Sequence, residues 1–157
     1  MKVYRKYILY SLLLFNLILR YPVGSSRQKG VDALLIHIHA NLVTQEGNVP
    51  WILDFKSWIG LYPFSQETGV PLILSAFSNI SNLNIELSML LISLYFCFLG
   101  SLSVFLLSRS LLSTFISQIT TVFIYSLSPI FIYYTDWNLG SRTVVISLLP
   151  LLIRNLP

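Results

Sequence analysis

The chain has 157 residues, of which 55% belong to the hydrophobic set and only 10% are charged. Soluble domains carry about 25% charged residues, and disordered chains combine high charge with low hydrophobicity, so the composition excludes both classes. Cys97 is the single cysteine, which also excludes a disulfide-stapled scaffold. The class that remains is an integral membrane protein, with the lipid bilayer as its first partner.

The net charge of +4 comes from ten Lys and Arg residues against six Asp and Glu residues. The basic residues do not cluster beyond Lys2, Arg5 and Lys6, which stand directly before an apolar run. Such residues anchor membrane spans to anionic lipid, whereas nucleic-acid binding needs a basic stripe that neutralises several phosphates. The charge pattern therefore predicts a membrane anchor and no nucleic-acid partner.

Residues 1–23 are predicted to form the first transmembrane helix. The uncharged run 7–19 is shorter than the about 20 residues that a span requires, but snorkelling of Lys6 and Arg20 extends it. A cleavable signal peptide is the alternative, since the start is basic, the apolar core is short and 24–26 are small residues. The charge of Arg20 between core and cleavage site favours an uncleaved signal anchor.

Residues 24–84 are too polar to cross a membrane and too rich in aromatic residues for a flexible linker. The apolar periodicity predicts a helix over 32–45 that stops at Gly47, and a second short helix over about 71–80. Amphipathic helices among Trp and Tyr residues lie naturally at the level of the lipid headgroups. We therefore expect an extracytoplasmic loop with two interfacial helices.

The remainder, 85–157, is predicted to form a transmembrane hairpin and a short or truncated fourth helix. The uncharged runs 87–108 and 110–134 are each long enough to span, and they follow each other so closely that they must be antiparallel. Pro129 lies near the end of the second run and predicts a kink or an early stop there. The last apolar segment, 144–153, covers only half a bilayer. The expected fold is thus all-α and polytopic, with three to four transmembrane helices.

The two hairpin spans carry stripes of small and hydroxyl-bearing residues. Such residues let helices approach closely in lipid and bond across the contact, so we expect the two stripes to face each other. On the first span the stripe is Ser93, Cys97, Gly100, Ser101 and Ser108, and on the second it is Ser113, Ser117, Thr120, Thr121 and Ser128.

The orientation follows from the basic residues near the amino terminus. Three of the first six residues are Lys or Arg, which favours a cytoplasmic start, although in this orientation the ten Lys and Arg residues of the whole chain divide evenly between the two sides. We therefore expect a plasma-membrane protein with its amino terminus in the cytoplasm and the 24–84 loop outside.

Few residues of the chain fit a known chemical motif. His37 and His39 point about 200° apart on a helix, so they cannot share one ion, and no zinc spacing is present. Cys97 lies in mid-span and is interpreted as a packing residue. Asp32 follows Gly30 where the 32–45 helix begins, so it is either a helix cap or a functional carboxylate at the membrane surface.

Four short motifs follow the first span: GVDA at 30–33, GNVPW at 47–51, GLYP at 60–63 and GVPL at 69–72. With these motifs and this spacing of spans, the chain resembles the amino-terminal part of the GT-C glycosyltransferases. These are integral membrane enzymes that use polyprenyl-phosphate-linked sugars, and they include oligosaccharyltransferase catalytic subunits and mannosyl- and arabinosyltransferases. In that superfamily the first extracytoplasmic loop carries an acidic residue and two helices along the membrane. The resemblance implies a third or less of a hexosyl- or oligosaccharyl-transferring enzyme, incomplete on its own.

The same resemblance implies roles for two acids, and a neighbouring arginine is a candidate on its own chemistry. Asp32 would be the first-loop acid, acting as general base or as ligand of a divalent cation, Mg²⁺ or Mn²⁺. Asp136 would be the second-loop acid, although segment 135–138 has one acid where metal-binding members usually have a pair. Arg142 could meet a lipid phosphate as a charge-assisted donor, or it could anchor the helix at the membrane or pair with Asp136.

Aromatic residues of the loop are candidates for binding the donor. Trp51, Trp58 and Tyr62 could stack on a sugar or a polyprenyl unit, and an interfacial aromatic belt explains them equally well. The alternative function is a non-enzymatic membrane accessory protein or a truncated relic, in which Asp32 only caps its helix. A transporter is disfavoured because no predicted span carries an Asp, Glu or His at mid-membrane.

Overall fold

The computed structural model describes residues 2–21, 31–47 and 69–156. All regular secondary structure in these ranges is α-helical, which confirms the all-α class. In chain order the helices are α1 (Lys2–Leu19), α2 (Val31–Glu46), α3 (Gly69–Ser81), α4 (Ile85–Leu111), α5 (Phe115–Leu127), α6 (Pro129–Thr135) and α7 (Ser141–Arg154).

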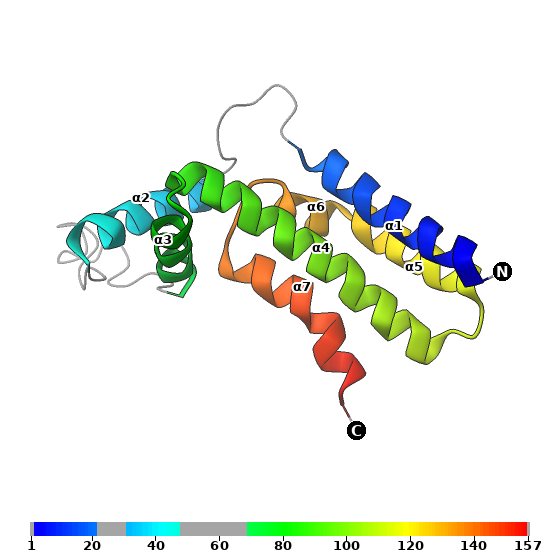
Figure 1. Ribbon diagram of the computed structural model, residues 1–157. Helices are drawn as coiled ribbons and strands as arrows, with labels where there is room; N and C mark the ends of the chain where they lie inside the picture. Colours follow the sequence, from blue (N-terminus) through cyan, green and yellow to red (C-terminus); the bar gives the residue numbers. More distant parts are fainter. Residues whose placement is uncertain (1, 22–30, 48–68, 157) are drawn as a thin grey trace.

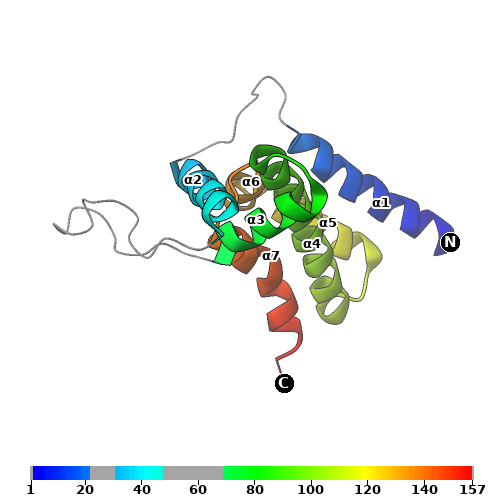
Figure 2. The ribbon, with the colours of Figure 1, turned by 60° about the vertical axis from the view of Figure 1, so that its left-hand side comes forward.

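The longest helix, α4, is the axis around which the others pack (Figure 1). Helices α1 and α5 run along one side of it and α7 along another, while α2 and α3 lie at its amino-terminal end (Figures 1 and 2). The side chain of Asn84 caps α4 by accepting a hydrogen bond from the Leu87 amide at 2.7 Å. Glu86 in its first turn and Arg109 in its last turn complement the helix dipole.

Among the described residues, α4 is the one unbroken helix long and apolar enough to cross a membrane. Its 27 residues extend about 40 Å, which exceeds the about 30 Å of a hydrocarbon core. The pair α5 and α6 meets the same criterion only when the two helices are taken together. Helix α1 has a shorter uncharged stretch because Arg5 and Lys6 lie in its first turns.

The segment expected as a span over 110–134 is divided into two helices at Pro129, where the sequence predicted a kink or an early stop. Helices α5 and α6 meet at Ser128 with a bend of 61°. Pro129 has no amide hydrogen for the Tyr125 carbonyl, which instead accepts from the Ser128 amide at 3.1 Å. The Ser128 hydroxyl then caps the new helix by accepting from the Phe131 amide at 3.4 Å. Pro129 and its capping serine therefore end one helix and begin the next.

The stripe of small residues on α4 is buried, as expected, but its partner differs from the prediction. From α5 only Val122 and Ser126 are buried, while Ser117 and Thr120 face outward. From this stripe Ser101 contacts Ser126 on α5, and the other contacts of the small residues include α6 and α7. A Cβ atom on Gly100 would lie 2.6 Å from the Phe131 ring and 3.3 Å from the Ser147 Cα, so glycine is required for this close contact.

The two helices of the first loop agree with the sequence. Helix α2 covers the predicted 32–45, and α3 covers the predicted 71–80. Gly47 ends α2 with a left-handed φ of +72°, and its amide donates to the Val43 carbonyl at 2.9 Å. Helix α7 contains the predicted 144–153 and carries Pro150 within it.

Candidate functional site

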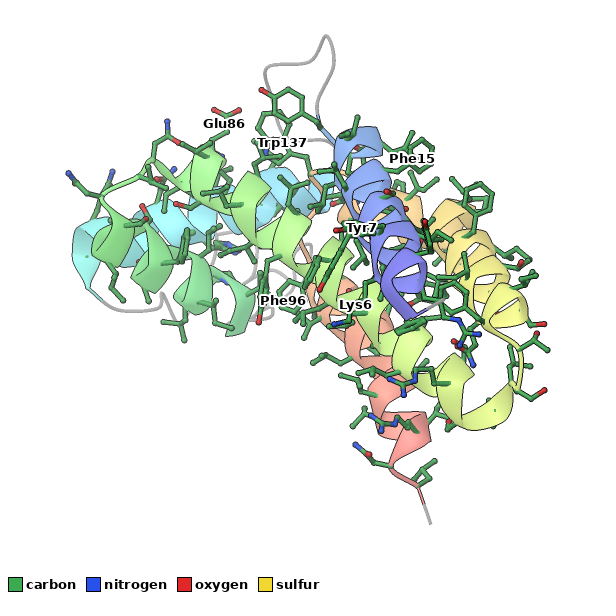
Figure 3. The ribbon with its side chains drawn as sticks, turned by 45° about the vertical axis from the view of Figure 1, so that its right-hand side comes forward. Lys6, Tyr7, Phe15, Glu86, Phe96 and Trp137 are labelled. Atoms are coloured by element: carbon green, nitrogen blue, oxygen red, sulfur yellow. The ribbon has the colours of Figure 1, made fainter. Side chains whose placement is uncertain are left out.

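The connection between α6 and α7 forms a tight structure against the amino-terminal end of α4. Trp137 adopts a left-handed φ of +57°, is buried, and donates its indole N–H to the Glu86 carbonyl at 3.3 Å (Figure 3). The hydroxyl of Thr143 donates to the Tyr134 carbonyl at 2.7 Å and accepts from the Gly140 amide at 3.1 Å. These bonds fix the backbone on both sides of Asp136, which is half-buried at the end of α6.

The chain position of Asp32 lies at the same end of the molecule. Asp32 is in the first turn of α2, although its side chain lies outside the described part. The next residue, Ala33, is fully buried in one apolar cluster with Trp137 and Leu139, which follow Asp136. Both ribbon views place the beginning of α2 beside the α6–α7 connection (Figures 1 and 2). The fold therefore brings together the two segments that carry the sequence-predicted acids.

Arg20, which the sequence did not indicate as a site residue, lies next to this connection. Arg20, directly after α1, was expected to snorkel to the membrane surface, but it points inward and is only 1% exposed. Its guanidinium Nε donates to the Thr135 hydroxyl at 2.6 Å and its Nη2 donates to the Ser126 carbonyl at 2.7 Å. The negative charge of Asp136 also acts favourably on this cation. Arg20 is thus an interior residue, and the expectation of a surface anchor was wrong.

A buried chain of polar groups continues from Arg20 between the helices. Asn16 donates its side-chain amide to the Ser126 hydroxyl at 3.0 Å, and that hydroxyl lies 3.2 Å from the Ser101 hydroxyl on α4. The sequence contains an indication of this network, because Asn16 interrupts an apolar run and Arg20 follows it by four residues on the same helix face. The network joins α1, α4, α5 and α6 through hydrogen bonds, which are needed because burying these polar groups without partners would cost free energy.

Arg142 begins α7 on the exposed side of the α6–α7 connection. Its guanidinium donates to the Tyr134 hydroxyl at 3.0 Å and lies 6.0 Å from the centre of the same ring. Because the residue is exposed, it can also reach an anionic group in solvent or at a lipid surface. The structure therefore places one buried and one exposed cation beside the segment that contains Asp136.

The histidines do not form a metal site with their described neighbours. His39 is buried, and this burial lowers the pKa of its imidazole from the ordinary value. Within 2–21, 31–47 and 69–156 no group of three His, Cys, Asp or Glu side chains could hold a metal ion. Carboxylate oxygens from Asp32 and Asp136 are of the type that Mg²⁺ and Mn²⁺ prefer, and Mg²⁺ commonly takes only one or two protein carboxylates together with substrate phosphate and water.

The aromatic candidates Trp51, Trp58 and Tyr62 lie outside the described residues.

Comparison of the chain with protein-family models, characterised proteins and solved structures gave no match. The geometry around Asp136 and the start of α2 is therefore the basis for a functional interpretation.

Proposed function

We propose that this chain is the amino-terminal portion of a GT-C-like integral membrane glycosyltransferase that uses a polyprenyl-phosphate-linked sugar. The observation that carries the proposal is the convergence of the Asp32 and Asp136 segments at one end of α4. A carboxylate in the first loop and a second in the next extracytoplasmic connection is the arrangement that the resemblance implies. Residues far apart in the sequence would thereby supply one site.

The proposed membrane arrangement has α4 crossing the bilayer and α1, the bent pair α5–α6 and α7 packed beside it, giving three to four membrane helices. The charge distribution supports the orientation. The start of α1 and the carboxyl-terminal ends of α4 and α7 lie toward one end of the molecule, whereas Glu86 and Trp137 lie toward the other (Figures 1 and 3). The described charged residues of the first end are all basic: Arg5, Lys6, Arg109 and Arg154. This end would face the cytoplasm. The other end, which holds acids together with Arg20 and Arg142, would face the outside of the plasma membrane, with α2 and α3 at the interface.

In the proposed reaction the acceptor attacks the anomeric carbon of the donor sugar. The bond between that carbon and the phosphate oxygen breaks, and polyprenyl phosphate leaves. Asp32 accepts the proton from the acceptor, and Arg142 stabilises the charge on the departing phosphate. A divalent cation, Mg²⁺ or Mn²⁺, would supply further charge neutralisation when bound by Asp32 and Asp136.

The test is sugar transfer by the whole protein that contains this chain, with an Asp32→Asn substitution. Asn caps a helix about as well as Asp, so a capping role predicts an almost unchanged protein. Loss of a general base predicts a fall of about 10²–10⁴-fold in the transfer rate while membrane insertion is retained. We expect Asp136→Asn to reduce transfer less, because the second-loop match has only one acid.

The control variant is Glu86→Gln, which changes an acid at the same end that is assigned no catalytic role. Normal transfer by Asp32→Asn would contradict the catalytic role of Asp32, which would then be a helix cap. A wild-type whole protein that inserts into the membrane but transfers no sugar would contradict the proposed function and favour a non-enzymatic accessory protein, the alternative that the sequence leaves open.

A further inference from the structure

The break between α5 and α6 disrupts the backbone hydrogen bonds of a helix. In an unbroken helix the carbonyl of Ser126 would accept from the amide of Ile130. At the break the bridging bonds run from the Ser128 amide to the Tyr125 carbonyl and from the Ile132 amide to the Ser128 carbonyl. The Ser126 carbonyl accepts instead from the Arg20 guanidinium, at 2.7 Å. A side chain from α1 thus satisfies an acceptor at the break.

Arg20 holds both arms of the bend simultaneously. Its Nη2 bonds to Ser126 on α5, its Nε bonds to the Thr135 hydroxyl on α6, and its guanidinium carbon lies 4.9 Å from the centre of the Phe131 ring. Its Nη1 donates to the Asn16 carbonyl at 3.1 Å, which ties the side chain back to its own helix. Arginine suits this task because its planar fork presents donors in several fixed directions, whereas lysine carries one compact ammonium.

The contacts of Phe131 transmit this constraint to the central helix. The ring is fully buried and would lie 2.6 Å from a Cβ atom on Gly100, so it fits against α4 without spare room. Thr135 is also buried, directly precedes Asp136, and donates to the Phe131 carbonyl at 2.5 Å. The position of the Asp136 connection therefore depends on how the bend is held.

We propose that Arg20 is a positioning residue that fixes the bend between α5 and α6 and thereby holds the Asp136 connection against the beginning of α2. The structural part of this proposal is independent of the reaction. Its catalytic consequence rests on the proposed function, because only then does the placement of Asp136 affect a rate.

Trp137 supplies a direct readout of the bend. The chain has three tryptophans, so replacing Trp51 and Trp58 by Phe leaves Trp137 as the only indole. Trp137 is buried two residues after Thr135. In lipid nanodiscs we expect Arg20→Gln to increase acrylamide quenching of Trp137 several-fold and to shift its emission to longer wavelength.

Two further variants distinguish two roles of Arg20: holding both helices of the bend by hydrogen bonds, which we call the clamp, and supplying only a buried charge. Arg20→Lys keeps the charge but cannot reach both arms, so we expect increased quenching close to that of Arg20→Gln. Thr135→Val removes one acceptor with little change in shape, so the protein should fold and show a smaller increase. Arg109→Gln removes an exposed arginine from α4 and should leave quenching unchanged.

Protected Trp137 in Arg20→Gln, or wild-type quenching in Arg20→Lys, would overturn the proposal.

Sugar transfer by the whole protein with its native tryptophans is measured in parallel. Arg20→Gln should lower kcat more than it raises KM, because a displaced acid impairs the chemical step. Asp32→Asn should leave Trp137 protected. Absence of sugar transfer by the wild-type whole protein, together with exposed Trp137 in Arg20→Gln, would therefore remove the proposed function and retain the clamp.

Discussion

Around its amino-terminal end α4 packs through large apolar side chains, whereas from Ser93 onward it packs mainly through small and hydroxyl-bearing ones. The first region joins α2, α3 and the α6–α7 connection in one cluster that contains Leu74, Met89 and Trp137. In the second region the buried residues of α4 include Ser101, a glycine and further serines, and the apolar cluster is small. The two ends of one helix are therefore stabilised by different kinds of contact.

Both regions expose large apolar side chains. Along the second region these include Leu14, Ile116 and Ile124, and around the amino-terminal end of α4 they include Ile73 and Ile80. The end of α2, in contrast, exposes the polar residues Gln45 and Glu46. Apolar side chains outside and small residues inside are typical of helices packed in lipid, where close approach replaces hydrophobic burial. We therefore propose that the second region lies in lipid and that the end of α2 lies in water.

The largest expected effect is the loss of a large side chain from the apolar region. Leu74 on α3 is fully buried, whereas Leu72 on the same helix is 43% exposed. We expect Leu74→Ala to lower the free energy of unfolding by about 2–5 kcal/mol, because it removes buried surface and leaves a cavity. Leu72→Ala should change it by no more than about 0.5 kcal/mol. Unfolding by SDS titration in mixed micelles measures both, and equal effects would show that this region has no apolar core.

A smaller effect is expected where the helices meet through small residues. Gly100→Ala places a methyl group against the Phe131 ring, so we expect a loss of about 1–3 kcal/mol from overpacking. Gly69→Ala is the matched control, because a Cβ atom there meets nothing within 4 Å. The same titration compares the two variants. An unchanged free energy of unfolding in Gly100→Ala would show that α4, α6 and α7 are not in such close contact.

The smallest effect concerns pH and His39 in the apolar region. Burial lowers the pKa of His39 below its ordinary value of 6.5, so the unfolded chain binds the proton first as the pH falls. The free energy of unfolding should therefore be unaffected above pH 6.5 and should decrease as the pH falls below it. His39→Gln should remove this part of the pH dependence. An identical pH profile in the wild type and in His39→Gln would place this imidazole in solvent.

The sequence predicted the elements better than their contacts. Periodicity and stop signals were sufficient for α2 and α3, because Gly47 and the apolar spacing act locally. Pro129 predicted a kink or an early stop near the end of the 110–134 span, but composition reports length and not the direction of the bend. The Arg20 side chain that bonds to both helices at the bend comes from a helix that lies far away in the sequence.

The candidate site shows the same limit. Sequence motifs singled out Asp32, Asp136 and Arg142, and the fold brings the segments of the two acids together. The inward direction of Arg20 could not be predicted from its position at a span end, where arginines ordinarily snorkel. Its hydrogen-bond partners on α5 and α6 decide the direction, and they are known only from the tertiary structure.

The most direct test of the two environments is spin-label accessibility in liposomes. Nitroxides are placed singly at Phe123, which is exposed on α5, and at Gln45, which is exposed at the end of α2. Lipid-facing sites are accessible to dissolved oxygen, and aqueous sites are accessible to a polar nickel chelate. We expect oxygen to dominate relaxation at position 123 and the chelate to dominate at position 45. Equal access of the chelate to both positions would contradict a membrane-embedded region around α4 and α5.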